Sequence, residues 1–265
     1  MPTLEWIGKS KVINHHQEVP FRVLERKYSF DENGEHSEDN GSDNMIIRGD
    51  NLEALKALLP RYEGRVKCIY IDPPYNTGNE GWVYNDNVND PKIKKWLGEV
   101  VGKEGEDLTR HDKWLCMMYP RLKLLQKLLA DDGVIFISID DREQVLLRMI
   151  CNEIFGENNF LAQFVWQKRT SPDMRKLVST AHEYVCAYCK DISYLPNAIS
   201  KVALSEEDAE NYKNPDNDPR GPWASSDFTA QGFRPNQMYE IITPGGARYT
   251  PPEGRCWKNV ESEFI

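Results

Sequence analysis

The sequence contains no apolar run long enough to span a membrane, and its first residues lack the apolar block of a secretory signal. We therefore expect a cytoplasmic protein with no membrane partner. Cysteine is also scarce: six cysteines are scattered along the chain, which favours reduced thiols over a disulfide scaffold. Cys186 and Cys189 form a C-x-x-C pair, but without a second pair or a suitable histidine spacing we expect no metal site.

The sequence lacks an excess of basic residues as well, since its formal net charge is -9 at pH 7. Proteins bind DNA largely by neutralising phosphates, so this charge does not favour a nucleic-acid partner. Net charge does not fix the local field in a cleft, however, and one short segment is basic. It contains Lys168, Arg169, Arg175 and Lys176. These side chains either contact phosphate or line a solvated loop, and the sequence leaves both alternatives open.

The 265 residues are enough for one large domain or two small ones. Residues 1–44 are polar and predict an N-terminal arm. Residues 45–195 alternate strand-like and helix-like patterns, as in a doubly wound α/β sheet. Residues 196–265 are rich in Pro, Gly, Asn and Asp without a clear period, which predicts a loop-rich segment.

Five strands and three helices are expected within residues 45–195, together with one long polar insert that we expect to be a functional loop. The strands are residues 45–48, 66–71, 134–139, 160–167 and 183–189, the last two as an antiparallel edge pair; the helices follow Asn51, His111 and Asp141; the insert is residues 79–110.

The segment Asp72-Pro73-Pro74-Tyr75 directly follows the predicted strand 66–71. Two prolines prevent both further ladder pairing and an immediate helix, so the chain must leave the sheet in a stiff, extended loop. This loop carries one carboxylate and one aromatic ring. Because α/β sheets bind ligands at the carboxyl ends of their strands, we predict a catalytic site here rather than a surface turn.

This loop, read together with Met45–Leu55, resembles the amino-group DNA methyltransferases, and more narrowly the modification subunits of type III restriction–modification systems. The resemblance continues through Arg110–Leu115, Gly133–Asp140, His182–Val185 and Pro251–Trp257. It implies a partial Rossmann-like methyltransferase sheet followed by the start of a target-recognition region. The implied activity is site-specific adenine-N6 methylation of double-stranded DNA, with S-adenosylmethionine as the cofactor.

The resemblance also assigns roles to residues. Asp72 and the Pro73 carbonyl would each accept one amino hydrogen of adenine and favour a pyramidal nitrogen, while Pro74 completes the motif. Tyr75 would stack on a base flipped out of the duplex. Two further residues, Asp50 and Asn51, would bind the cofactor. The alternative role for Asp50 is to cap the helix that follows it.

The sequence departs from the family at one point, because it has no glycine-rich Phe-x-Gly-x-Gly cofactor loop. We therefore expect a truncated chain that is inactive alone, or a missing C-terminal half on another chain. A second modification subunit and a restriction subunit are the other expected partners. Two alternatives stay open: a cytosine-N4 methyltransferase and a non-catalytic DNA-binding remnant. The aspartate at position 72 favours adenine by resemblance, since cytosine-N4 enzymes more often carry serine there.

Overall fold

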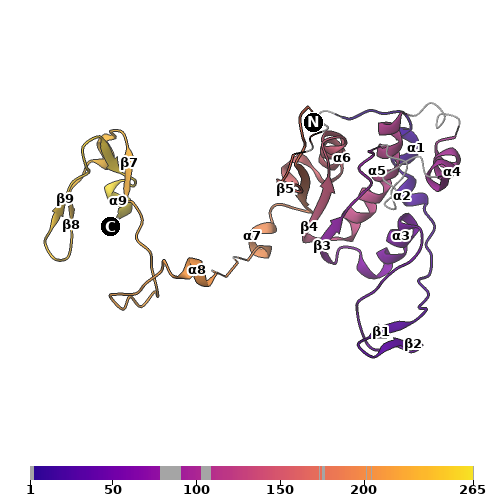
Figure 1. The fold of residues 1–265 in the computed structure, drawn as a ribbon, viewed down its shortest axis with the longest axis horizontal. Coiled ribbons are helices and arrows are strands. Elements are labelled where there is room, and N and C mark those ends of the chain that lie inside the picture. Colours follow the sequence, from indigo (N-terminus) through magenta and orange to yellow (C-terminus); the bar gives the residue numbers. More distant parts are fainter. Residues whose placement is uncertain are drawn as a thin grey trace. The chain divides into compact units, whose positions relative to one another are not determined.

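The computed structural model describes residues 3–77, 91–102, 109–172, 174, 177–200, 202–203 and 205–264. The chain divides into two compact units, Met1–Ser200 and Lys201–Ile265 (Figure 1). None of the helices in these described ranges is both long and apolar enough to cross a membrane.

The first unit is built on a four-stranded sheet with the order β3-β4-β6-β5. Strand β3 (Val66–Ile71) pairs in parallel with β4 (Leu129–Ile139). Strand β6 (His182–Cys189) pairs antiparallel with both β4 and β5 (Phe160–Gln167). The mixed sheet confirms the α/β class, and β5 and β6 form the expected antiparallel pair with β5 at the edge.

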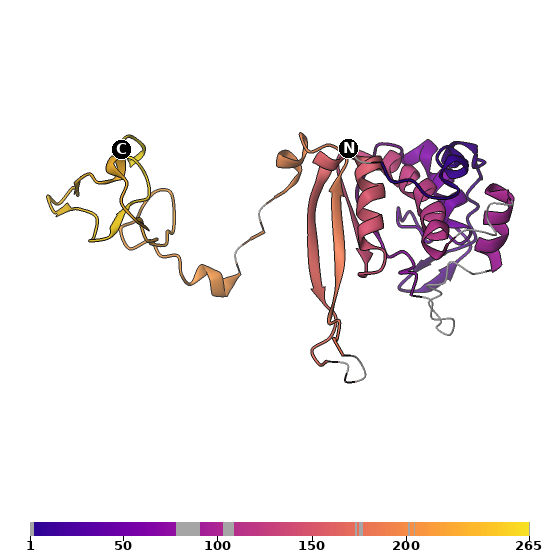
Figure 2. The ribbon, with the colours of Figure 1, turned by 90° about the horizontal axis from the view of Figure 1, so that it is seen from above.

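Helices α3 (Asn51–Tyr62), α5 (Arg110–Leu128) and α6 (Gln144–Phe155) gather on one side of this sheet (Figure 2). Helix α5 is central, because it contacts α3, α6 and the two short helices α1 (Lys9–Val12) and α2 (His15–Glu18). Most of its side chains are buried, in keeping with a helix that is covered on several sides.

The two faces of the sheet differ in burial because side chains alternate along a strand. On β4, Ile135, Ile137 and Ile139 point towards the helices and are fully buried. The opposite face, which we call the open face, carries aromatic side chains that remain partly or largely exposed. Its members include Tyr70, Phe136, Phe164 and Trp166.

The predicted strand at residues 45–48 is wrong, because this segment has no regular structure. Ile46 is 94% exposed, and Met45 is exposed as well. A strand needs a neighbour for its amide and carbonyl groups, and among the described strands β3 pairs only with β4. The apolar pattern of residues 45–48 therefore indicates neither a strand nor burial in the described structure.

The N-terminal residues pack on the helical layer through a buried lysine. Lys9, at the start of α1, places its Nζ 2.9 Å from Glu153 Oε2 and 2.7 Å from the Leu4 carbonyl. It also lies 5.0 Å from the centre of the Trp6 ring. Because the charge is paired and solvated by these groups, it can be buried at a modest cost.

The remaining elements of the first unit are short. They are β1 (Ser29–Asp31), β2 (Gly34–His36), α4 (Pro91–Val100), η2 (Glu157–Asn159) and α7 (Leu195–Ala198). Helix α4 lies within the predicted polar insert, of which residues 79–90 and 103–108 lie outside the described residues.

The second unit is described by itself. Its short elements are α8 (Glu206–Ala209), β7 (Thr229–Gln231), η3 (Pro235–Gln237), β8 (Ile241–Ile242), β9 (Arg248–Tyr249), β10 (Arg255–Trp257) and α9 (Glu261–Phe264). Strand β10 pairs with β7, and β8 pairs with β9. The buried Trp257 ring contacts Phe228 and Tyr239 at centroid distances of 5.6 and 6.4 Å, which gives this unit a small aromatic core.

Gly133 in β4 generates a prediction about stability. A Cβ at this position would lie 2.7 Å from the Val66 carbonyl oxygen and 2.9 Å from the Ala130 carbonyl oxygen, both of them backbone atoms. We expect Gly133→Ala to lower the free energy of unfolding by on the order of 2 kcal/mol, because the strands must shift to relieve the overlap. Urea unfolding of the two chains measures this difference.

The matched control is Gly98→Ala in α4, where a Cβ would meet open space. This change is expected to be neutral or to stabilise the protein by up to about 1 kcal/mol, since alanine is the better helix former. Equal unfolding midpoints for Gly133→Ala and the unchanged protein would contradict the prediction.

Candidate active site at the Asp72 loop

The predicted catalytic segment leaves the sheet at the carboxyl end of β3, as expected. Residues 72–77 have no regular structure; Asp72 is exposed, whereas Pro73 and Asn76 are buried. The end of the parallel neighbour β4 lies at the same edge of the sheet. The start of β6 lies there too, because Tyr184 pairs with Ile139. The ends of β3 and β4 and the start of β6 therefore lie at the same edge of the sheet as the Asp72 loop.

The loop is fixed from the helical layer by Trp114 on α5. The Trp114 Nε1–H donates to the Pro74 carbonyl at 2.6 Å, and the Trp114 side chain is fully buried. Helix α5 begins with a capping box between Thr109 and Asp112, which sets the start of the helix beside the loop. Within the described ranges no hydrogen bond reaches the Pro73 carbonyl, so its oxygen remains available as an acceptor.

Tyr75 is half-buried and its hydroxyl donates to Glu183 Oε2 at 3.3 Å. Burial, followed by the hydrogen bond and charge of Asp72, raises the pKa of the Tyr75 phenol well above its usual range. The phenol therefore stays neutral across the physiological pH range. The same Glu183 binds Lys168, whose Nζ lies 2.5 Å from Oε1.

A polar cluster lies under the far end of the loop, in which Asn76 and Glu143 are buried and His111 is about half-exposed. The Asn76 Nδ2 donates to the Arg110 carbonyl at 3.3 Å and to Glu143 Oε1, and His111 Nδ1 lies 2.7 Å from the same oxygen. Glu143 is fully buried, and burial raises the pKa of its carboxyl, opposed by Asn76 and His111. Sequence reasoning missed Glu143, because nothing in its local pattern distinguishes it from a surface glutamate.

The two predicted cofactor residues already have structural partners. Asp50 Oδ1 accepts from the amides of Leu52 and Glu53 at 2.9 and 3.2 Å, so Asp50 caps α3 as the alternative reading expected. Asn51 Oδ1 accepts from Arg121 Nε at 2.8 Å. Binding of a cofactor by either residue stays a prediction.

The predicted basic segment lies in the connection between β5 and β6. The amides of Lys168 and Arg169 both donate to the Ala181 carbonyl, at 2.9 and 3.2 Å, which continues the pairing of these strands by one step. Arg175 and Lys176 lie outside the described residues. Lys168 is linked to the Asp72 loop because Glu183 binds both Lys168 and Tyr75. Contact of the basic segment with DNA stays a prediction.

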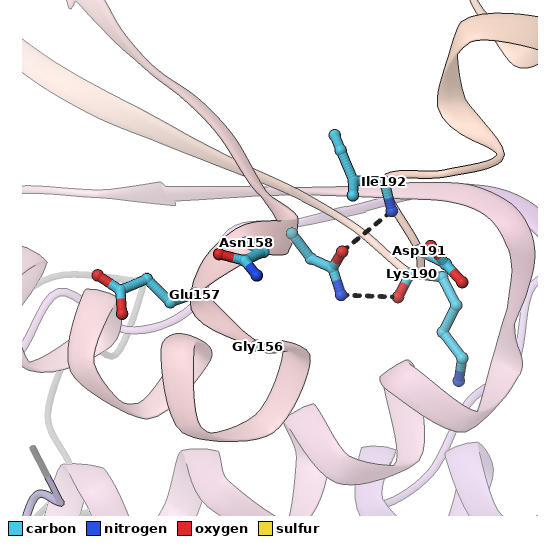
Figure 3. Close-up of a pocket in the computed structure, with 7 residues that line it drawn as sticks. Gly156, Glu157, Asn158, Lys190, Asp191 and Ile192 are labelled. Carbon is cyan, nitrogen blue, oxygen red and sulfur yellow. Dashed lines mark hydrogen bonds between the residues drawn. The ribbon is translucent and has the colours of Figure 1, made fainter. Parts of the chain in front are cut away.

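A surface depression occurs at the other end of the sheet, near the last residue of β6. Asn159 donates to the Lys190 carbonyl at 3.1 Å and accepts from the Ile192 amide at 3.0 Å (Figure 3). These bonds tie two chain segments together and leave no set of convergent reactive groups. Nor does any group of three His, Cys, Asp or Glu side chains suitable for a metal occur in the part of the chain that the structure describes.

Several known proteins are similar to this chain. The family model described as DNA methylase matches residues 66–244. The chain is 36% identical to the EcoP15I Mod subunit, a type III restriction-modification enzyme of Escherichia coli, over 231 residues that cover 79% of this chain and 35% of that protein. It is 38% identical to the EcoPI Mod subunit of Escherichia phage P1, covering 71% of this chain and 30% of that protein.

A third type III Mod subunit, StyLTI of Salmonella typhimurium, is 36% identical and covers 86% of this chain and 36% of its own length. The chain thus spans about a third of the length of these relatives. Among solved structures, the PvuII cytosine-N4 DNA methyltransferase matches with 15% identity and a TM-score of 0.33, covering 58% of this chain and 56% of that chain.

Proposed function

Because this chain belongs to the DNA methylase family, we propose that it carries the catalytic loop of a DNA adenine-N6 methyltransferase that uses S-adenosylmethionine. Its similarity to type III Mod subunits supports a place in a restriction–modification system in the cytoplasm. The observation that carries the proposal is the exposed Asp72 carboxylate at the carboxyl end of β3, on a loop that α5 holds in place.

The exocyclic amino group of adenine is a poor nucleophile because its lone pair is delocalised into the ring. Asp72 and the Pro73 carbonyl can each accept one amino hydrogen, which turns the lone pair out of the ring plane as the nitrogen becomes pyramidal. The Pro74 carbonyl is already occupied by Trp114, so Pro73 is the oxygen left for the substrate. S-adenosylmethionine, when bound, supplies an electrophilic methyl group on a sulfonium sulfur. Transfer would form a nitrogen–carbon bond as the methyl–sulfur bond breaks to leave a neutral thioether, and one of the amino hydrogens held by Asp72 and Pro73 would leave as a proton to solvent.

Tyr75 supports the recognition of a flipped base. A half-buried ring at the rim of the loop offers a face for stacking, and base–aromatic stacking is typically worth about 1–3 kcal/mol. The raised pKa of its phenol keeps the ring uncharged beside Asp72. The aspartate at the head of the motif favours adenine over cytosine as the target.

The sheet also supports a protein partner. Strand β3 has a pairing partner on one side only among the described strands, and Tyr70 on the open face is 62% exposed. We propose that the remaining part of a methyltransferase domain, on this polypeptide or another, pairs with β3 and supplies the cofactor loop. Double-stranded DNA, a second modification subunit and a restriction subunit complete the proposed assembly.

The first functional prediction concerns Asp72. When the chain is joined to the remaining part of the methyltransferase domain of the EcoP15I relative, Asp72→Ala should lower methyl transfer by about a thousandfold. The reason is that one of the two acceptors for the amino hydrogens is lost. Incorporation of labelled methyl groups into DNA measures the rate, and DNA affinity should change less than about threefold.

Asp132→Ala is the matched control, since Asp132 is a carboxylate paired with Lys67 at the opposite end of the same two strands. This variant should retain methyl transfer. Near wild-type turnover in Asp72→Ala would remove Asp72 from the mechanism.

The second functional prediction separates the two roles of Asp50. Serine is also a good helix cap, so Asp50→Ser should keep the thermal stability of the chain. If the carboxylate also binds the adenosine part of the cofactor, the same change should weaken S-adenosylmethionine binding about tenfold in the joined enzyme, measured by calorimetry. An unchanged affinity would leave Asp50 with its capping role alone. The chain by itself should bind the cofactor weakly in both forms, because β3 pairs with β4 alone among the strands that the structure describes.

The third functional prediction concerns the basic segment. Replacing Lys168, Arg169, Arg175 and Lys176 by methionine should weaken binding to all DNA sequences alike. The slope of log affinity against log salt should become shallower, by up to about 3.6 when all four side chains contact phosphate, since each phosphate contact contributes about 0.9.

A control variant removes the same number of cations elsewhere in the first unit, at Arg22, Arg26, Lys27 and Arg61, which are all largely exposed. Its salt dependence should match that of the unchanged protein. An unchanged slope in the basic-segment variant would favour the alternative that these four side chains line a solvated loop and do not contact phosphate.

A further inference from the structure

Three polar side chains from three elements meet under the end of the Asp72 loop. Asn76 comes from the loop itself, His111 from the first turn of α5, and Glu143 from the residue before α6. Glu143 Oε1 is the common acceptor, since Asn76 Nδ2 donates to it and His111 Nδ1 lies 2.7 Å from it. We call these three residues the Asn76 cluster.

Burial of the two polar side chains Asn76 and Glu143 costs free energy. Glu143 is fully buried and Asn76 is 1% exposed. In the described part of the chain, Glu143 Oε2 and Asn76 Oδ1 have no hydrogen-bond partner. Apolar residues of similar volume usually give equal or greater stability than such a buried polar group. The cluster therefore needs an explanation other than packing.

The position of Glu143 points to that explanation. It occupies the N-cap position of α6, yet its side chain makes no capping hydrogen bond. An N-cap side chain normally accepts from the first amides of its own helix. The Glu143 carboxylate is instead directed at Asn76, so it stabilises the loop and not the helix.

The backbone of Asn76 has an unusual conformation that its side-chain contacts help to hold. Its φ is 58°, in the left-handed region that side chains other than glycine seldom adopt. Tyr75 thus lies between two fixed points: the Pro74 carbonyl, held by Trp114, and the Asn76 side chain, held by Glu143 and the Arg110 carbonyl. Trp114 and Arg110, which bind these two points, both belong to the first two turns of α5.

We infer that Glu143 is a positioning residue of the Asp72 loop: bound in turn by His111, it holds Asn76 and thereby helps to fix Tyr75 and the Pro73 carbonyl for methyl transfer. The positioning itself is a property of this chain, and its effect on catalysis rests on the proposed function. The two parts can therefore be tested separately.

Amide hydrogen exchange of the chain tests the positioning. Glu143→Leu removes the acceptor of the cluster, and Asn76→Gly removes the anchored side chain while tolerating the left-handed backbone. Each change should raise exchange at the amides of residues 75–77 about tenfold, with β4 and β6 unaffected. The double variant should match the single ones, because both break the same link. Glu143→Gln keeps an acceptor oxygen and should stay close to the unchanged protein.

The control is Glu153→Gln on the same helix, whose carboxylate binds Lys9 and Tyr119 and does not touch the loop. It should lower thermal stability without changing exchange at residues 75–77. Glu143→Leu should mobilise the loop, and it should also lower the melting temperature because the buried Asn76 amide loses its acceptor. Wild-type exchange at residues 75–77 in both Glu143→Leu and Asn76→Gly would overturn the inference.

The catalytic part is measured in the enzyme joined to the remaining methyltransferase domain. Glu143→Leu and Asn76→Gly should lower kcat between about tenfold and a hundredfold and leave the KM for DNA nearly unchanged, because misplacement of the loop affects the transition state. Glu143→Gln should restore most of kcat. A wild-type kcat in both variants would overturn the positioning role, whereas the proposed function would fail only if Asp72→Ala also retained turnover.

Discussion

The hydrogen bond from the Trp114 indole to the Pro74 carbonyl joins the interior of the helical layer to the candidate catalytic loop. Two consecutive prolines leave this loop with no amide donors of its own at those positions, so it cannot be held by a backbone ladder. Its geometry must come from a side chain that is itself immobile. Trp114 meets that need because its ring is fully buried in the middle of the core. This contact fixes one end of the loop, and the hydrogen bonds of the Asn76 side chain fix the other end.

Much of the fold could be predicted from the sequence because burial alternates along the chain. The strand at residues 66–71 and the core of β4 follow a period of two, and the buried apolar residues of α5 recur at helical spacing. The strand expected at residues 45–48 failed because strand formation depends on a neighbour, which local pattern cannot reveal. The role of Asp50 as a helix cap was among the expected alternatives, since capping depends on adjacent residues alone.

The site was harder to predict than the fold, for the same reason. Asp72 and Tyr75 could be selected as candidates because they flank two prolines at the end of a predicted strand. Glu143 lies 67 positions from Asn76 along the sequence, and its burial results from packing between α5, α6 and the loop. Likewise, Glu183 links Tyr75 to Lys168 only because β6 runs antiparallel to β4 and returns to the same edge. Contacts of this kind arise from topology, and composition or periodicity carries no trace of them.

Among the described strands, one edge of β3 has no pairing partner, which has a consequence for the protein in solution. An unpaired strand edge next to exposed aromatic side chains is a template for pairing with any other strand, including that of an identical copy. Two copies of the chain that meet at this edge would cover their exposed strands against each other, so the tendency to aggregate should rise with the concentration of the protein.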